Sequence, residues 1–243
     1  MRIRVITYNV HKCIGGVDRR YQPDRVGDII AHYRPDLALL QEVTSGVKRL
    51  RGHRQVDLLG TRLGMRHRAY VPNVHYPRGG EYGNAVLGIH PIVDLRNIDL
   101  TIPPKKRRGV LHVRTRIGMG SGRRVTLHVF NLHLGLSGIE RKMQLRRFLE
   151  SQPFARLDQR APIVLAGDFN DLWGTLGRKL LVPAGFRGLR RPIRTFPAFA
   201  PVRALDSIYL RGPVRFVRVF RSRLLLAKHA SDHLPLIADL EVS

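Results

Sequence analysis

Short runs of apolar residues recur along the chain, and several of them stop at side chains capable of chemistry. Such runs end at Asn9, Glu42, His133 and Asp168, and Ser231-Asp232-His233 directly precedes a further run. Buried strands have this apolar character, and reactive groups gather where strands give way to loops. We therefore expect carboxylate, amide and imidazole groups from distant parts of the sequence to meet at one edge of a sheet.

Helical periodicity is found in three stretches. The first begins at Pro23 and stops before Pro35. Its apolar face consists of Val26, Ile29, Ile30 and Tyr33. Further helices are expected over Gln55–Leu63 and over Ile139–Glu150, the latter with an apolar face of Met143, Leu145, Phe148 and Leu149.

Strands are predicted between and after these helices. The expected strands are Arg2–Thr7, Asp36–Glu42, His67–Val71, Asn84–Ile89, Gly109–Ile117, Arg123–Leu132, Pro162–Ala166, Ala204–Leu210, Val214–Val219 and Leu234–Leu240. The first strand–helix–strand unit favours neighbouring parallel strands, and the turn Gly118–Gly122 indicates a hairpin. Runs of strands broken by a few helices favour an α+β sandwich of two packed sheets with outer helices. Because the polar strand ends are spread over the whole chain, we expect residues 1–243 to form a single domain.

The composition is strongly basic. The chain has 43 Lys and Arg against 18 Asp and Glu, a formal net charge of +25 and a pI near 11.5. This balance favours a polyanionic partner such as DNA, RNA, an anionic membrane surface or a phosphorylated small molecule. The alternative is that abundant Arg, Ala, Gly and Pro reflect a GC-rich genome.

The cysteine count and the hydropathy of the chain indicate where in the cell the protein is expected. Cys13 is the sole cysteine, which excludes an internal disulfide and suits a reducing environment. No apolar run approaches the roughly 18–20 residues of a membrane span, and a strand starting at Arg2 leaves no room for a signal peptide. The expectation is a cytoplasmic monomer.

The residue types at the strand ends suit phosphodiester hydrolysis, which needs a cation, a positioned water and stabilisation of the leaving oxygen. Hard oxygen ligands hold Mg²⁺ or Mn²⁺. Glu42 is the best ligand candidate in the sequence, and Asn9 and Asp232 are candidates to complete the metal site.

The remaining candidates are catalytic groups. Asp168 and Asn170, two residues apart, can share a face, so a carboxylate that takes the proton of water lies beside an amide that orients it. His233 is a donor to a phosphoryl oxygen, with Asp206 holding its tautomer, and His133 is a second imidazole. Taken singly, Asn9 or Asn170 would be read as a turn residue. Their co-occurrence favours an active site.

A series of motifs then identifies a resemblance. The segments are Thr7-Tyr8-Asn9-Val10-His11, Gln41-Glu42-Val43, Tyr82-Gly83-Asn84-Ala85, Asn131-Leu132-His133-Leu134, Gly167-Asp168-Phe169-Asn170, Leu205-Asp206-Ser207-Ile208 and Ser231-Asp232-His233-Leu234-Pro235. In this order they resemble the endonuclease/exonuclease/phosphatase, or deoxyribonuclease-I-like, superfamily over essentially the whole chain. The resemblance implies a four-layered α/β sandwich and divalent-metal-dependent phosphoester hydrolysis. It also implies Glu42 as principal metal ligand and an Asp206–His233 pair at the scissile phosphate.

The substrate stays open at this stage. His11 replaces the acidic residue that abasic-site endonucleases of the superfamily tend to carry, and the chain is most similar to a small bacterial subgroup of unassigned hydrolases. Candidate substrate-binding residues are Arg78, Tyr82, Asn84 and Arg108. Nucleic acid is the first expectation, a phospholipid or inositol phosphate is the alternative, and a catalytically silent polyanion-binding module is the third reading. Trp173 is either a core anchor or part of the cleft rim.

Overall fold

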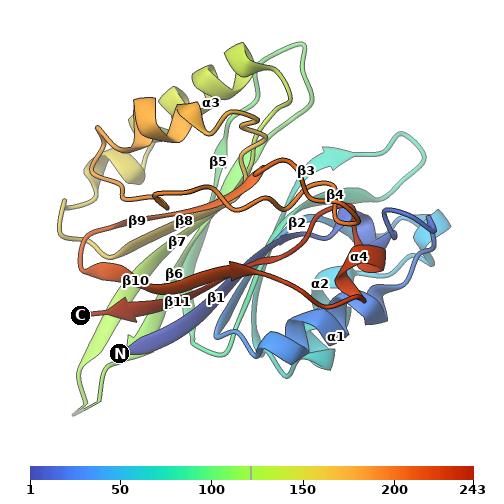
Figure 1. The fold of residues 1–243 in the computed structure, drawn as a ribbon, viewed down its shortest axis with the longest axis horizontal. Coiled ribbons are helices and arrows are strands. Elements are labelled where there is room, and N and C mark those ends of the chain that lie inside the picture. The colour runs from blue at the N-terminus through green and yellow to red at the C-terminus, as the bar shows by residue number, and fades with distance from the viewer. Residues whose placement is uncertain (121) are drawn as a thin grey trace.

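Two β-sheets lie face to face, with helices on their outer sides (Figure 1). The structure is a computed structural model that describes residues 1–120 and 122–243. The six-stranded sheet has the order β10-β11-β1-β2-β4-β3 and the five-stranded sheet the order β5-β6-β7-β8-β9. The first comprises β1 (Arg2–Asn9), β2 (Leu37–Ser45), β3 (His67–His75), β4 (Glu81–Gly88), β10 (Val214–Arg221) and β11 (Leu236–Val242). The second comprises β5 (Ile92–Asp99), β6 (Gly109–Gly118), β7 (Arg124–His133), β8 (Ile163–Asp168) and β9 (Asp206–Arg211).

Alternation along the strands creates three separate apolar layers. On β1, Val5 faces the space between the sheets, whereas Ile6 faces outward. The outer face of the six-stranded sheet packs on α1 (Pro23–Tyr33), with α2 (Gln55–Arg62) and α4 (Ala227–Ala230) on the same side. The outer face of the five-stranded sheet packs on Leu145 and Phe148 of α3 (Gly138–Glu150). The order helix, sheet, sheet, helix confirms the predicted four-layered sandwich.

Most predicted elements are present, with shifted ends. The strand β5 was not predicted because it is a mostly exposed edge strand whose residues show no regular alternation. Strand β2 continues past Glu42 to Ser45. Met143 is exposed, so the core face of α3 forms without it. Strands β6 and β7 form the predicted hairpin, although the expected turn Gly118–Gly122 includes Ser121, which lies outside the described residues. No helix in the described residues has the length and hydropathy needed to cross a membrane.

Strand directions bring the polar strand ends together. Parallel pairing of β1 with β2 and of β7 with β8 places the carboxyl ends of each pair side by side, with His133 opposite Asp168. Strand β9 runs antiparallel to β8, so Asp206 at its start also lies opposite Asp168. The last strand, β11, pairs antiparallel with β1, which brings the residues just before β11 to the end of β1.

Candidate active site

A cleft of about 470 Å³ opens where these strand ends meet. Its walls come from both sheets, so residues far apart in sequence share one surface. The lining includes Asn9, Lys12, Glu42, Tyr82, Lys106, Arg108, His133, Asp168, Asn170, Arg203, Asp232 and His233.

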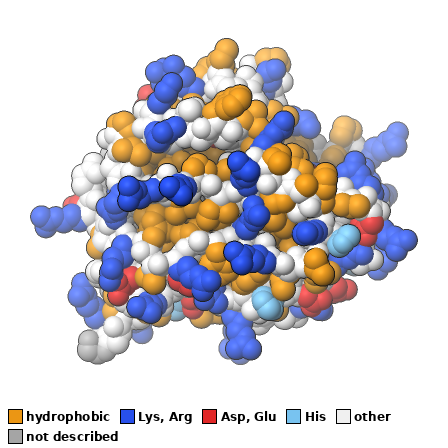
Figure 2. Space-filling model, viewed as in Figure 1, with side chains coloured by type: hydrophobic (Ala, Val, Ile, Leu, Met, Phe, Trp, Pro, Cys, Tyr) orange, Lys and Arg blue, Asp and Glu red, His pale blue; other side chains and the backbone are white. Residues whose placement is uncertain are grey.

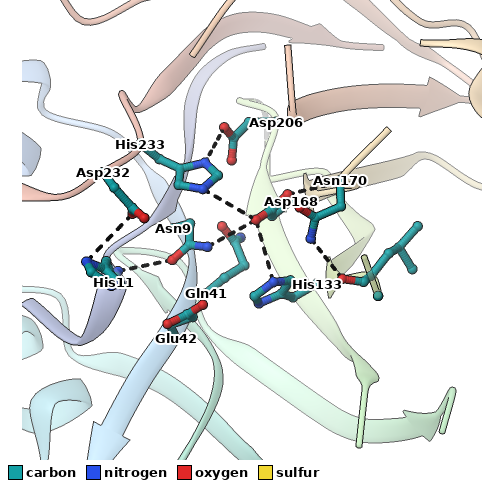
Figure 3. Close-up of polar contacts among 12 residues, drawn as sticks. Asn9, His11, Gln41, Glu42, His133, Asp168, Asn170, Asp206, Asp232 and His233 are labelled. Carbon is teal, nitrogen blue, oxygen red and sulfur yellow. Dashed lines mark hydrogen bonds and ion pairs between the residues drawn. The ribbon is translucent and has the colours of Figure 1, made fainter. Parts of the chain in front are cut away.

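Asp168 lies at the centre of the polar network (Figure 3). Its Oδ2 accepts a hydrogen bond from Asn9 Nδ2 at 3.0 Å and lies 3.5 Å from His133 Nε2 and 3.7 Å from His233 Nε2. Its Oδ1 accepts from the backbone N–H of Asn170 at 3.0 Å. Gly167, at φ +146°, permits this position, since a Cβ there would lie 2.0 Å from the carbonyl oxygen of Leu132. The buried carboxylate is therefore held by two hydrogen-bond donors, Asn9 Nδ2 and the Asn170 backbone N–H, with two imidazoles close by.

His233 is oriented by Asp206. Its Nδ1 lies 2.9 Å from Asp206 Oδ2, which also accepts a hydrogen bond from the Thr195 hydroxyl at 2.5 Å. Burial alone would lower the pKa of His233, but the charges of Asp206 and Asp168 outweigh it and raise this pKa to about 10. Burial, together with the charge of Asp206, raises the pKa of Asp168 to about 6. At neutral pH the site thus holds an imidazolium between two carboxylates.

Glu42 reaches the cleft through a backbone irregularity. A bulge between Leu40 and Val43 gives Glu42 a φ of +56°, a conformation that costs a non-glycine residue energy and is common at functional sites. Its carboxylate forms an ion pair with Lys12 Nζ. Burial would raise the pKa of Glu42, but the positive charge of the neighbouring Lys12 outweighs burial, and this pKa is lowered to about 2.

Lys12 is a cleft residue that sequence reasoning missed. His11, Lys12 and Cys13 have φ values of 46°, 61° and 59°, so three successive non-glycine residues are left-handed. Buried Gln55 holds this turn, because its Nε2 donates to the Lys12 carbonyl at 2.8 Å. No hydrophobic pattern reveals such a turn. The position of a lysine three residues after Asn9 was the available signal.

The oxygen-bearing residues fit a divalent cation. Asn9 lies between the carboxylates of Glu42 and Asp232 in Figure 3, and all three line the cleft. Carboxylate and amide oxygens are the donors that Mg²⁺ and Mn²⁺ prefer. A second group, Asp168, Asp206 and His233, has ligand atoms within 4.8 Å of one another. In that group His233 Nδ1 and Asp206 Oδ2 already contact each other at 2.9 Å.

Three further polar residues line the cleft: His133, Tyr82 and Arg108. His133 is buried, and burial together with the charge of Arg108 lowers its pKa well below the usual value, so the ring is neutral. Lys12 Nζ lies 5.0 Å from the centre of the Tyr82 ring. Arg108 Nε is buried and has no hydrogen-bond partner among the described residues.

Two of the proposed substrate-binding residues do not reach the cleft. Asn84 is buried between the sheets, where its Nδ2 donates to the carbonyls of Gly109 and Asn131 at 3.0 and 3.2 Å. This side chain joins β4 to the second sheet. Arg78 lies on the turn between β3 and β4 and lines a separate hollow with Lys48 and Arg49, because the turn carries it away from the strand ends.

Trp173 is not a core anchor, since its side chain is 80% exposed. It follows cleft-lining Leu172 but borders a neighbouring hollow with Arg178 and Arg190. The sequence left its position open, and the structure places it outside the catalytic network.

The model of the Endonuclease/Exonuclease/phosphatase family matches residues 6–233. An uncharacterized protein of Escherichia coli K12, YbhP, is 32% identical over 251 residues, covering 98% of this chain and 96% of its own length.

Solved structures share the fold. An endonuclease/exonuclease/phosphatase from Beutenbergia cavernae has a TM-score of 0.83 at 24% identity, covering all of this chain and 72% of that one. The human Nocturnin catalytic domain with bound sulfate has a TM-score of 0.74 at 21% identity, covering 100% and 94%. D. rerio TDP2 complexed with a single-strand DNA product has a TM-score of 0.71 at 20% identity, covering 99% of each chain. With its motifs assembled in one cleft and matched over nearly its whole length, the chain belongs to the Endonuclease/Exonuclease/phosphatase family.

Proposed function

We propose that this protein is a divalent-metal-dependent phosphodiesterase whose active site is the cleft at the strand ends. The observation that carries the proposal is the position of Asp168, a buried carboxylate between Asn9 and two imidazoles, in a cleft that Glu42 and Asp232 also line. A binding module would need the basic surface alone and would have no use for this network.

Glu42, Asn9 and Asp232 would hold the cation, which supplies charge neutralisation at the phosphate when bound. Arg108, with its unpartnered Nε, and Tyr82 would contact the substrate from the lining of the cleft. Neutral His133 would donate a hydrogen bond to a phosphoryl oxygen. These groups fix the phosphorus atom next to Asp168.

Asp168 and His233 would divide the proton chemistry. Above its pKa of about 6, Asp168 accepts the proton of the attacking water, which Asn170 orients. The Asn170 amide nitrogen already donates to the Leu134 carbonyl, so its oxygen is directed by that bond. His233, protonated below about 10, donates to the phosphoryl oxygen on which charge accumulates. The bond from water oxygen to phosphorus forms, the bond to the leaving oxygen breaks, and the leaving oxygen takes a proton from solvent.

The proposal also covers the domain organisation, the cation, the oligomeric state, the location and the substrate of the protein. Residues 1–243 would act as one catalytic domain, and Mg²⁺ or Mn²⁺ would be the cation. A monomer in the cytoplasm suits the unpaired, buried Cys13. Nucleic acid stays a predicted substrate, supported by the net charge of +25, and a phospholipid or inositol phosphate is the second candidate.

Hydrolysis of bis(p-nitrophenyl) phosphate by the purified protein tests the reaction without choosing a natural substrate. We expect release of nitrophenol with Mg²⁺ or Mn²⁺ and none with EDTA. Asp168→Asn should lower turnover about a thousandfold, as expected when a group acting in the transition state is removed. Asp24→Asn is the matched control, because Asp24 is exposed and lies outside the cleft. Equal turnover in both variants, or in EDTA, would refute the mechanism.

A further inference from the structure

Exposed apolar side chains gather around the mouth of the cleft. Leu136 and Leu172 line it, Ile139 and Trp173 follow them closely in sequence, and the loop that carries Phe199 begins with cleft-lining Phe196. We call this set the apolar rim: Leu136, Ile139, Leu172, Trp173, Phe199 and Val202. Ile139, Leu136 and Trp173 are 75–80% exposed. Single exposed apolar residues are ordinary, but six from three segments that border one opening indicate a contact surface.

Two segments that border the rim carry only basic charged residues. The segment Leu172–Leu205 contains seven Lys and Arg and no Asp or Glu. Among the described residues, none of these seven side chains lies within ion-pair distance of a carboxylate. On another side of the opening, Thr101–Gly109 adds four basic residues and no acid, and Lys106 and Arg108 line the cleft. Figure 2 shows the same imbalance on one face, where blue side chains lie among orange ones and red ones are few.

The chemistry of the rim distinguishes between anionic partners. Four of its six residues are aliphatic, and aliphatic side chains offer no ring on which a nucleobase can stack. Leu and Ile gain instead by leaving water for hydrocarbon, and Trp and Phe settle at the boundary between headgroups and acyl chains. Unpaired Arg side chains beside them bind the phosphates of anionic lipids. An anionic bilayer offers hydrocarbon to the apolar side chains and phosphates to the arginines.

We propose that the apolar rim and its surrounding arginines dock on an anionic phospholipid bilayer, so that the cleft opens onto the headgroup layer. The docking rests on these surface residues alone, whereas the idea that the cleft then receives a lipid phosphodiester rests also on the function proposed above.

Trp173 provides the direct measurement, because it is the sole tryptophan in the chain. With vesicles of phosphatidylcholine and phosphatidylglycerol in equal parts, its fluorescence should shift to the blue and be quenched by brominated acyl chains. Vesicles of phosphatidylcholine alone should give little change. An emission unaffected by anionic vesicles at low salt would overturn the proposal.

Vesicle cosedimentation of variants locates the surface. The triple variant Ile139→Ser, Trp173→Ser, Phe199→Ser should bind anionic vesicles at least about tenfold more weakly than the unaltered protein. Leu225→Ser is a matched control, since Leu225 is 75% exposed but lies outside the rim. The pair Arg190→Ser, Arg191→Ser should also weaken binding, whereas the pair Arg66→Ser, Arg160→Ser, elsewhere on the surface, should not. Equal binding by the rim variant and its control would refute the assignment.

Turnover and DNA binding distinguish membrane docking from the proposed phosphodiesterase function and from nucleic-acid binding at the same surface. The triple variant should keep its turnover of bis(p-nitrophenyl) phosphate, because none of the three residues lines the cleft. Vesicle binding without any phosphodiester turnover would refute the proposed function and leave the docking surface standing. If the rim variants lost affinity for single-stranded DNA while vesicles were never bound, the surface would belong to nucleic acid and the membrane proposal would be wrong.

Discussion

Asp168 and His233 are linked so that neither titrates as an isolated group would. Burial raises the pKa of Asp168 to about 6, whereas the two carboxylates around His233 raise its pKa to about 10 against the effect of burial. A proton acceptor and a proton donor therefore coexist over the neutral range. This pairing gives the clearest consequences at the scale of single residues.

Turnover of a soluble phosphodiester should follow a bell-shaped pH profile. It should rise as Asp168 loses its proton near pH 6 and fall as His233 loses its proton near pH 10. In Asp206→Asn the carboxylate charge that raises both pKa values is gone, so both limbs should move to lower pH. Profiles of kcat for the two proteins test this. An alkaline limb that stays in place would show that Asp206 does not set the pKa of His233.

Lys12 should compete with a cation for Glu42. The ammonium contacts the carboxylate that we propose as a metal ligand, so Lys12→Met should tighten Mn²⁺ binding. The expected gain is about fivefold, since a partly screened ion pair contributes on the order of 1 kcal/mol. Calorimetric titration with Mn²⁺ measures this directly. Lys48→Met, at an exposed lysine outside the cleft, is the control, and equal affinity in both variants would contradict the competition.

Among the residues of the candidate site, those that directly follow an apolar run could be predicted from the sequence. Asn9, His133 and Asp168 follow apolar runs, and parallel strands bring such ends together. Lys12 and the φ of Glu42 were not predictable, because a left-handed turn and a bulge depend on tertiary contacts such as that of Gln55. Asn84, in contrast, was predicted to bind substrate and does not line the cleft. An amide within a motif proved to be a bridge between the sheets.

At the scale of elements, a buried amide joins the two sheets beneath the cleft. Asn131 of β7 donates to the carbonyls of Leu40 and Ala85 at 2.9 and 2.8 Å and accepts from Gln41 Nε2 at 2.7 Å. Gln41 directly precedes Glu42. The site therefore depends on buried hydrogen bonds that cross from one sheet to the other.

Asn131→Leu should destabilise the protein and disturb the site. It removes the donors for two buried carbonyls and the acceptor for Gln41, so we expect the free energy of unfolding to fall by about 3 kcal/mol. Urea denaturation measures the change. Asn97→Leu, on the exposed part of β5, is the control and should stay within about 0.5 kcal/mol of the unaltered protein. A similar effect of both substitutions would remove the special role of the bridge.

Helices and strands could be predicted where one of their faces is buried, because burial makes apolar residues recur at a regular spacing along the sequence. The helices α1 and α3 and the strands with buried alternate faces follow from their patterns, and β5 escaped because an exposed edge imposes none. Helix α4, with four residues, is too short to show a helical period.

At the scale of the whole molecule, the charge of +25 opposes compactness. Like charges repel across the folded surface, and added salt screens that repulsion. Thermal unfolding should therefore occur at a higher Tm as NaCl rises from low to physiological concentration, by a few degrees. Sucrose at equal osmolality serves as the control for solvent effects unrelated to charge. A Tm independent of NaCl would mean that the positive charges are already balanced within the fold.

The pairing of β1 with β11 has a consequence for biosynthesis. Met1 and Val242 exchange backbone hydrogen bonds at 2.7 and 2.8 Å, and β1 lies between β2 and β11. While a ribosome is still adding the residues of β11, β1 lacks one neighbour and His233 has no strand to hold it beside Asp206. Under the proposed function, the active site of a nascent chain would therefore stay incomplete until that strand has emerged.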